Sequence, residues 1–300
     1  LNRYGSNRPK IVLVEPAESC GVFDSFVKGE RTSPSGNLKT IMAGLNCGIP
    51  SKSAWNIIKN GCDGQTDFYE IVIFEMYLCT SAPTTPTTSA TVDLTNCSQI
   101  FNNASGATAN VSQGVSVDLT GTYTRPPDGS YTHGYARMDN TFGITASFQI
   151  DGSMDGQSSG SGVFCRTITG SGTHSSTATH NDESVCSSSE VAAGKYTETL
   201  THFDGVGDPW KVQDTASGIN GTSAAITGIL VDSNGHLAAT EGEVVKLEGL
   251  VAFANALTID TDTTSLTMSF NLGEGMSLNS AGADKIYIGS GPFQAIMTAN

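Results

Sequence analysis

Apolar and polar residues alternate along much of the chain after residue 90. In three stretches every second position is apolar: Val115, Val117, Leu119 and Tyr123; Phe142, Ile144, Ala146, Phe148 and Ile150; and Leu266, Met268, Phe270 and Leu272. Thr, Ser and Asn fill most of the positions between them. Because successive side chains of a β-strand point to opposite faces, this pattern predicts strands with one face on a core and one in water.

Turn-forming pairs separate these stretches. They are Asp128-Gly129, Asp151-Gly152, Asn220-Gly221 and Asn234-Gly235. Short strands between polar turns indicate a mainly β fold. We therefore expect an antiparallel sandwich or barrel-like arrangement over the acidic part, residues 90–300. The β-rich domain or domains are expected to span residues 91–300. The Ser- and Gly-rich stretch 152–190 lacks the alternation and is predicted to be a long loop.

The chain before residue 90 reads differently. A continuous apolar run at 10–15 predicts a buried strand, and two helices are predicted between residues 38 and 60, so residues 1–63 are expected to form a short α/β segment. Residues 64–79 are rich in Ile, Val, Phe and Tyr and predict an apolar strand. Residues 80–90 contain Pro83, Pro86 and many Thr, which favours an extended linker.

The net charge changes sign near residue 60. Residues 1–60 hold 8 Lys and Arg against 4 Asp and Glu, whereas residues 61–300 hold 7 against 25, for a net charge of −14 over the 300 residues. Such an acidic chain is a poor partner for nucleic acid or anionic lipid, since both bind clustered Lys and Arg. No apolar run is long enough for a membrane span. Charged residues make up only 15% of the chain, so uncharged Ser, Thr, Asn and Gly supply its polarity, as in secreted or surface β-proteins.

Four cysteines fall in the acidic part: Cys79, Cys97, Cys165 and Cys186. They allow two disulfides in three alternative pairings, and we expect disulfides here because the composition is typical of extracellular proteins. Cys20, Cys47 and Cys62 in the preceding part are expected to be free thiols.

One segment resembles a known enzyme family. The residues are Val14-Glu15-Pro16, Cys20, the string Thr40-Ile41-Met42-Ala43-Gly44-Leu45, then Cys47-Gly48, Pro50-Ser51 and Ala54-Trp55. Over about residues 8–63 they resemble the diaminopropionate ammonia-lyase family, which implies a pyridoxal-phosphate enzyme fold. In that family the Schiff-base lysine and the phosphate loop precede the matching segment, so no catalytic residue is carried over to this chain.

Other candidate sites are weaker. His174 and His180, with Asp182 and Glu183, could bind a metal, but a solvated loop is the simpler interpretation. Tyr123, Tyr131, Tyr135 and Trp210 could stack on sugars if they are exposed. Four Asn-x-Ser/Thr sequons offer glycosylation sites, and three of them follow the Thr/Pro linker closely. They lie at Asn96, Asn103, Asn110 and Asn220.

These observations favour a non-enzymatic, extracellular or cell-surface structural subunit that assembles with copies of itself, as in a filament, pilus or virion, with glycans as further partners and no cofactor. Strand addition is the expected mode, because an extended apolar strand beside a linker can complete a neighbour's sheet. The predicted assembly strand carries Phe68, Ile71, Ile73, Met76 and Leu78, and the run at 10–15 is the second candidate. The alternatives are a fragment of a pyridoxal-phosphate-dependent ammonia-lyase and a carbohydrate- or partner-binding β-sandwich.

Overall fold

The computed structural model describes residues 62–64, 66–112, 116–177, 184–203, 208–217, 223–271, 275–280, 285–291 and 294–300. In this part of the chain eighteen strands form three sheets, beside one 3-10 turn, η3 (Glu241–Glu243). The mainly β fold predicted from the alternation is confirmed. None of the described residues belongs to a helix with the length and apolarity to cross a membrane. The predicted α/β segment lies outside the described residues, except for β1 (Cys62–Gly64) at its end.

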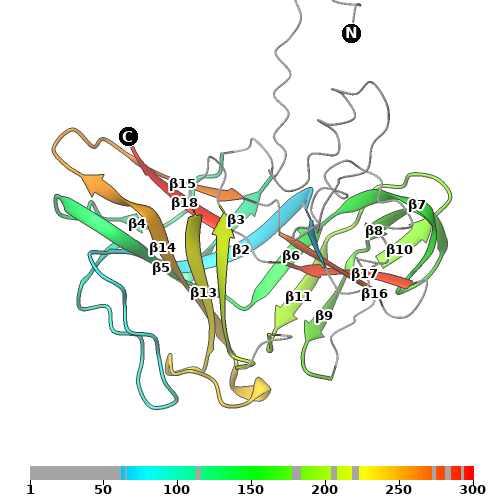
Figure 1. The fold of residues 1–300 in the computed structure, drawn as a ribbon, viewed down its shortest axis with the longest axis horizontal. Coiled ribbons are helices and arrows are strands. Elements are labelled where there is room, and N and C mark those ends of the chain that lie inside the picture. Colours follow the sequence, from blue (N-terminus) through cyan, green and yellow to red (C-terminus); the bar gives the residue numbers. More distant parts are fainter. Residues whose placement is uncertain are drawn as a thin grey trace, which may run out of the picture.

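The largest sheet has ten strands and is built around β2 (Phe68–Cys79). Its main path runs β12, β13, β14, β5, β2, β6, β11, β9; off this path β3 pairs with β2, and β4 pairs with β3 (Figure 1). The bounds are β3 (Cys97–Val111), β4 (Thr122–Tyr123), β5 (Gly129–Asp139), β6 (Thr141–Thr145), β9 (Gly170–His174), β11 (Tyr196–Leu200), β12 (Lys211–Ser217), β13 (Ser223–Val231) and β14 (Lys246–Ile259). The paired strands are antiparallel, apart from β9 and β11, which are parallel.

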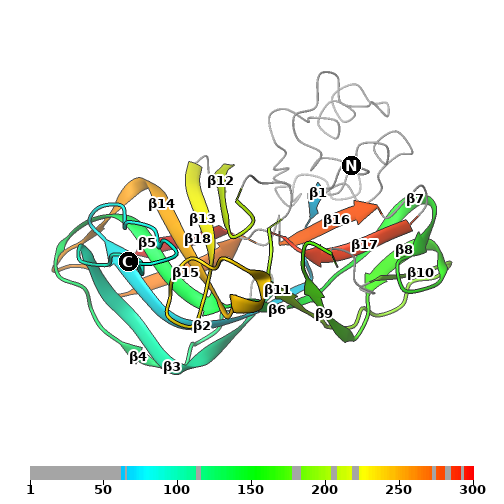
Figure 2. The same cartoon turned by 90° about the horizontal axis from the view of Figure 1, so that it is seen from below.

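A six-stranded sheet lies beside the first, at the right of Figure 1 and Figure 2. Its order is β1, β16 (Met276–Ser280), β17 (Lys285–Ser290), β7 (Ser147–Gly156), β8 (Ser161–Thr167) and β10 (Ser184–Ser187). Only β17 and β7 pair in parallel among these described strands. A separate pair, β15 (Leu266–Asn271) and β18 (Gln294–Ala299), packs against the core of the large sheet.

The chain passes between the two sheets several times, and the passage from β6 to β7 is the best defined. β5 and β6 both pair with β2, and the chain then passes through Ala146 into β7 of the smaller sheet. At the passage the buried Thr167 hydroxyl accepts the Ala146 N–H at 3.1 Å and donates to the Gly194 carbonyl at 2.7 Å. The strand predicted from Phe142 to Ile150 therefore exists as two strands, because this side-chain bond redirects the chain at its middle.

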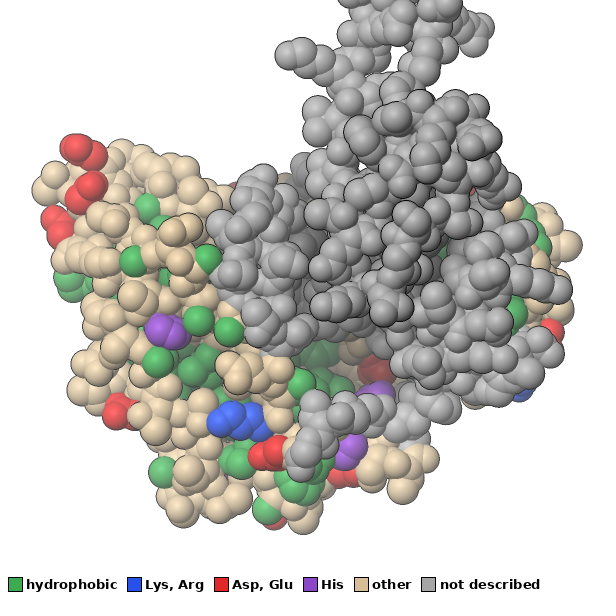
Figure 3. Space-filling view, in the orientation of Figure 1, with side chains coloured by type: hydrophobic (Ala, Val, Ile, Leu, Met, Phe, Trp, Pro, Cys, Tyr) green, Lys and Arg blue, Asp and Glu red, His purple; other side chains and the backbone are tan. Residues whose placement is uncertain are grey.

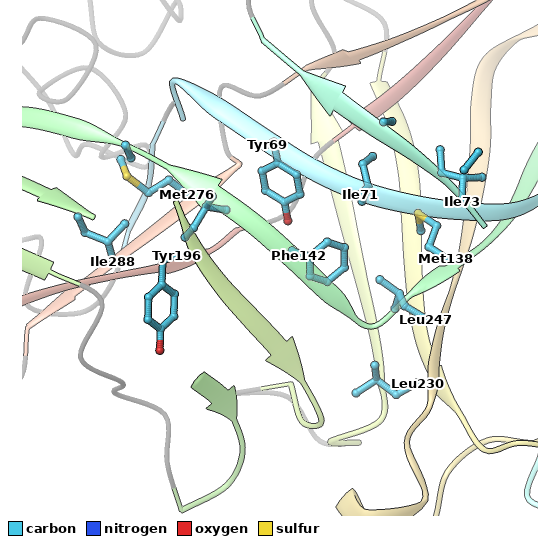
Figure 4. Close-up of a cluster of buried hydrophobic side chains, with 14 of the residues drawn as sticks. Tyr69, Ile71, Ile73, Met138, Phe142, Tyr196, Leu230, Leu247, Met276 and Ile288 are labelled. Carbon is cyan, nitrogen blue, oxygen red and sulfur yellow. The ribbon is translucent and has the colours of Figure 1, made fainter. Parts of the chain in front are cut away.

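The main core lies on one face of β2. Tyr69, Ile71 and Ile73 are nearly inaccessible there, and Figure 4 shows them beside Phe142 and Met138. The register with β3 shifts between Ile73 and Glu75, so the buried positions change from odd to even and continue as Met76 and Leu78. This β-bulge keeps the apolar side chains on the same core.

The other face of the large sheet carries a second, smaller core. Its buried residues are Cys79, Val92, Tyr135, Ile229, Val231 and Leu250. Val92 comes from the loop between β2 and β3, residues 80–96, which is bridged at Thr84 and Asp93. Pro83 and Pro86 are buried in this loop. Residues 80–90, predicted to be a linker, thus lie within a loop between two strands of one sheet.

The predicted disulfides are present in the described part of the chain. Cys79 pairs with Cys97 and Cys165 with Cys186, which selects one of the three pairings left open by the sequence. Each pair occupies directly opposed positions on neighbouring strands, β2 with β3 and β8 with β10.

Two predictions of local structure were wrong. Residues 152–190 were expected to be a loop, but they contain the second half of β7 together with β8, β9 and β10. These strands are held by the Cys165–Cys186 disulfide and by buried hydroxyls such as Ser184 and Thr167, in place of an apolar stripe. The alternation at 115–123 predicted a strand, yet among the described residues of this stretch, 116–123, only β4 forms, and Val117 and Tyr123 are exposed.

Candidate functional site

The most distinctive polar group in the described residues lies on the second core. Arg137 of β5 faces Glu248 of β14, and its Nε and Nη2 donate to Glu248 Oε1 at 3.2 and 2.9 Å. Arg137 Nη1 lies 3.5 Å from Glu75 Oε2 on β2. We call Arg137, Glu75, Glu248 and Tyr135 the Arg137 cluster. It joins three adjacent strands through one guanidinium.

Burial sets the electrostatics of the Arg137 cluster. The Glu248 side chain is fully inaccessible, and this burial raises the pKa of its carboxyl although Tyr135 and Arg137 act in the opposite direction. Burial and then the negative charge of Glu248 raise the pKa of Tyr135 strongly. For Arg137 burial lowers the pKa, but Tyr135 and Glu248 outweigh it and the net direction is upward. The guanidinium therefore stays charged against a buried carboxylate.

Two buried oxygen atoms of the cluster, Tyr135 Oη and Glu248 Oε2, have no hydrogen-bond partner in the described structure. A neighbouring tyrosine differs, because Tyr77 Oη accepts a hydrogen bond from Gln99 Nε2 at 2.9 Å. The two tyrosine rings lie 5.6 Å apart in an edge-on arrangement. The cluster is an ionic contact that joins β2, β5 and β14.

Metal binding at the predicted histidines finds no support in the described residues, where no group of three or more His, Cys, Asp or Glu is placed to hold a metal ion. His174 ends β9 with its Nδ1 3.7 Å from Glu198 Oε1, and Glu198 Oε2 accepts the Ser290 N–H at 2.6 Å. Glu198 therefore links β11 to β9 and to β17. The other members of the predicted group, His180, Asp182 and Glu183, lie outside the described residues.

The predicted assembly strand is central in the large sheet. One edge of β2 pairs with β3 over most of its length, and the other pairs with β5 and β6. Ile71, Ile73 and Leu78 are buried in the main core, and Met76 joins them there. Phe68 is half-buried. In the folded chain these residues already complete their own sheet, and the second candidate at 10–15 lies outside the described residues.

The neighbouring strand, β3, is paired over only part of its outer edge in the described residues, where the segment returning to β4 also contacts it through the Asn103 Nδ2 donor and the Thr120 carbonyl. On its outer edge the register pairs with β4 involve only Phe101 and Asn102, and the Thr124 N–H donates to the Ile100 carbonyl. Figure 2 shows β3 and β4 at the outer margin of the sheet beside β2. From residue 104 to residue 111 no described strand pairs with this edge. Local sequence patterns could not predict this arrangement, because they do not reveal which strands lie at the margin of a sheet.

Three of the predicted glycosylation sites are described. Asn96 is exposed in the loop before β3, and Asn110 is exposed near the end of β3. Asn103 is half-buried, and its Nδ2 donates to the Thr120 carbonyl at 2.7 Å. Asn96 and Asn110 therefore have exposed side chains, whereas the amide of Asn103 is engaged in a hydrogen bond. Asn220 lies outside the described residues.

The predicted sugar-stacking aromatics are mostly not at the surface. Tyr131 and Tyr135 are each 2% exposed, because both belong to cores. Trp210 is half-buried. Tyr123 is 62% exposed, with its hydroxyl donating to the Leu119 carbonyl at 2.6 Å. One of the four rings is thus open to a ligand.

Comparison with curated proteins finds a partial match to one enzyme. The diaminopropionate ammonia-lyases of Escherichia coli strain K12, E. coli O6:H1 and E. coli O157:H7 are each 41% identical to this chain over 57 residues, which is 19% of this chain and 14% of each enzyme. The match therefore spans about one seventh of the length of these relatives. No family model matches the chain, and no solved structure matches it. The length of the match fits the segment that carries the resemblance, residues 8–63.

Proposed function

We propose that this chain is a secreted or surface-exposed β-rich structural subunit that assembles with copies of itself by strand addition, as the protomer of a filament, pilus or virion does. The observation that carries the proposal is the outer edge of β3, where no described strand pairs with residues 104–111. An unpaired strand edge presents N–H and C=O groups that can accept another strand, and monomeric proteins usually protect such edges with charges, proline or short strands. β3 has 15 residues and contains no charged residue and no proline.

Two further observations support this proposal. The Cys79–Cys97 and Cys165–Cys186 disulfides are of the kind that forms and persists in oxidising compartments, which include the cell surface and the extracellular space. Uncharged side chains and backbone make up most of the described surface visible in Figure 3, with acidic and basic groups scattered over it. Electrostatic repulsion between copies is weaker for such a surface than for a densely charged one.

The β2 strand offers a second route to the same assembly. It fills a slot between β3 on one side and β5 and β6 on the other. The same slot in a neighbour would accept β2 by exchange, which keeps every native contact but makes it between chains. In this form the predicted donor residues, Phe68, Ile71, Ile73, Met76 and Leu78, act as a swapped strand.

The test is the association state of the purified full-length chain. Sedimentation velocity and negative-stain electron microscopy over a wide concentration range should reveal dimers or larger assemblies with defined contacts. A chain that remains a monomer at the highest soluble concentration contradicts the proposal.

A lyase fragment is the second candidate, because the similarity to diaminopropionate ammonia-lyase covers 57 residues at 41% identity. Incubation with pyridoxal phosphate should then produce the visible absorbance band of an internal aldimine, and borohydride should fix the cofactor to a lysine. Absence of both signals removes this candidate and leaves the structural proposal untouched.

A further inference from the structure

We propose that the Cys79–Cys97 disulfide is a thiol-exchange site, and that its reduction by an external dithiol releases the loop that covers the second core. This loop, residues 80–96 between β2 and β3, is called the strap below. The proposal gives one of the two described disulfides a chemical reaction, and gives the strap a change of structure that follows from it. Neither step depends on the proposed self-assembly.

The two described disulfides differ in how far solvent reaches them. Cys165 and Cys186 are each 1% exposed, so both ends of that bond lie in the main core. Cys79 is also inaccessible, but Cys97 is half-buried at the start of β3, on the border of the second core. Exchange requires a thiolate to reach one sulfur of the bond, so the bond with the more accessible cysteine reacts first.

The dithiol supplies both electrons of the reaction. Its thiolate attacks Cys97 Sγ to form a mixed disulfide, and the electron pair of the broken bond leaves with Cys79 Sγ, which takes up a proton. The second thiol of the reagent then attacks the mixed disulfide, which closes the cyclic disulfide of the reagent and releases Cys97 as a thiolate that is protonated from solvent. The neutral Cys79 thiol is a small apolar side chain that suits the core around it.

Few hydrogen bonds join the strap to elements other than β2 and β3. Among the described residues they are the Leu237 N–H to the Thr87 carbonyl at 3.0 Å, Lys211 Nζ to Thr85 Oγ1 at 2.9 Å, and Thr132 Oγ1 to the Thr80 carbonyl at 3.1 Å. Others, such as that from the Asp93 N–H to the Thr84 carbonyl, join the strap to itself. The disulfide closes the base of the strap and limits how far its ends can separate, so its loss removes a main constraint on the strap.

The strap covers an apolar surface of the large sheet, and Figure 1 shows it as the cyan loop at the lower left. Val92 of the strap is 8% exposed and belongs to the second core with Tyr135, Ile229 and Leu250, and Leu94 packs on the same core. Release of the strap therefore exposes apolar side chains of β5, β13 and β14 to solvent.

The order of reduction tests the exchange site. The folded full-length chain, with its free thiols first blocked by N-ethylmaleimide, is incubated with dithiothreitol at mildly alkaline pH. Samples are quenched at intervals with an isotopically labelled maleimide, digested and measured by mass spectrometry. Cys79 and Cys97 should be labelled about tenfold faster, or more, than Cys165 and Cys186, because the reagent reaches only the first bond without opening the main core.

Hydrogen exchange tests the release of the strap. After selective reduction, peptides from residues 80–96 should exchange about tenfold faster or more, because amides such as that of Asp93 lose their acceptors. Peptides that carry Ala107 and Ala109 should keep their protection, since both residues are buried in the main core.

A single substitution separates the bond from the side chain in the core. Cys97→Ala removes the disulfide and leaves Cys79 in the second core, so its strap should exchange fast without reductant. Cys186→Ala is the matched control, because it removes the other disulfide, and its strap should exchange as slowly as that of the oxidised wild type.

Two results would overturn the proposal. Labelling of Cys165 and Cys186 as fast as that of Cys79 and Cys97 would show that the exchange site is wrongly assigned. A strap that keeps its protection after Cys79 and Cys97 are reduced would show that the bond does not hold it in place. If Cys97→Ala does not fold, the labelling order and the hydrogen exchange of wild type still decide both steps. The association state of the chain, which tests the proposed function, is measured separately.

Discussion

Arg137 and Glu248 occupy directly opposed positions on β5 and β14, and a guanidinium–carboxylate contact of 2.9 Å joins them. The arginine side chain is 30% exposed and the glutamate is fully inaccessible. Since a buried carboxylate is costly unless it is paired, the stability of this part of the sheet depends on the arginine more than on the pair as a whole.

Replacing Arg137 should therefore be strongly destabilising. Arg137→Gln leaves Glu248 buried without its cation, and we expect a loss of about 3 kcal/mol in the free energy of unfolding, measured by urea denaturation. Lys195→Gln is the control, because Lys195 contacts Glu70 at 3.0 Å with both side chains partly exposed, and its loss should cost less than about 1 kcal/mol. Equal effects of the two substitutions would contradict the role given to burial.

The raised pKa of Glu248 predicts a pH dependence with a definite sign. Burial, the largest cause, raises the pKa above its ordinary value of 4.5, so the folded chain keeps a proton that the unfolded chain has already released. The contribution of Glu248 to stability therefore falls as pH rises from that ordinary value through the folded pKa, and is constant beyond it. Between pH 4 and pH 7, the free energy of unfolding of Glu248→Gln should therefore rise relative to that of wild type, as measured by denaturation at each pH. An exposed substitution, Glu190→Gln, should show no such shift.

Gly106 is required where β3 bulges against β2. Its φ is +81°, and an added Cβ would lie 2.5 Å from Val72 Cγ1. Gly235 has nearly the same φ, +80°, but an added Cβ there meets no atom closer than 3.5 Å. Gly235→Ala should cost about 1 kcal/mol for the left-handed backbone alone, and Gly106→Ala about 3 kcal/mol because the contact is added. Thermal unfolding of both variants measures the difference, and similar values would show that the neighbouring side chains move aside.

Each disulfide should contribute comparably to stability. The bonded cysteines are 18 residues apart in one case and 21 in the other, and cross-links of that span stabilise by about 3 kcal/mol through restriction of the unfolded chain. Cys79→Ala with Cys97→Ala, and Cys165→Ala with Cys186→Ala, are each expected to lose about that amount in denaturant unfolding. Adding reductant to either variant should produce a further loss from the remaining bond, and no further loss would mean that this bond is not formed.

The sequence predicts strands well where apolar residues carry the alternation. Leu266, Met268 and Phe270 alternate with exposed Thr267 and Ser269 on β15, as expected. The alternation does not show where a strand leaves one sheet for another. That change occurs at Ala146 and depends on Thr167, which is 21 residues away in the chain. Pairings set by such distant contacts are invisible to local periodicity.

The Arg137 cluster was missed for a related reason. Glu248 lies between Leu247 and Gly249 on a strand that also carries Lys246, and Arg137 lies between Ala136 and Met138 on a strand that also carries Asp139. The available signal was the presence of opposite charges in these two segments. It indicates a pair only when the two strands are neighbours, and the chain order does not tell that β5 and β14 lie side by side.

The positions of the two disulfides have a mechanical consequence. Tension applied through the ends of the chain would bypass the segments between Cys79 and Cys97 and between Cys165 and Cys186, because the sulfur–sulfur bonds carry the load. At ~3.4 Å per residue, the two bypassed segments together have a contour length of roughly 130 Å, and this length would not extend under the force. A molecule held at one end and pulled by fluid flow at the other would therefore extend less before covalent bonds break than the same chain without these disulfides.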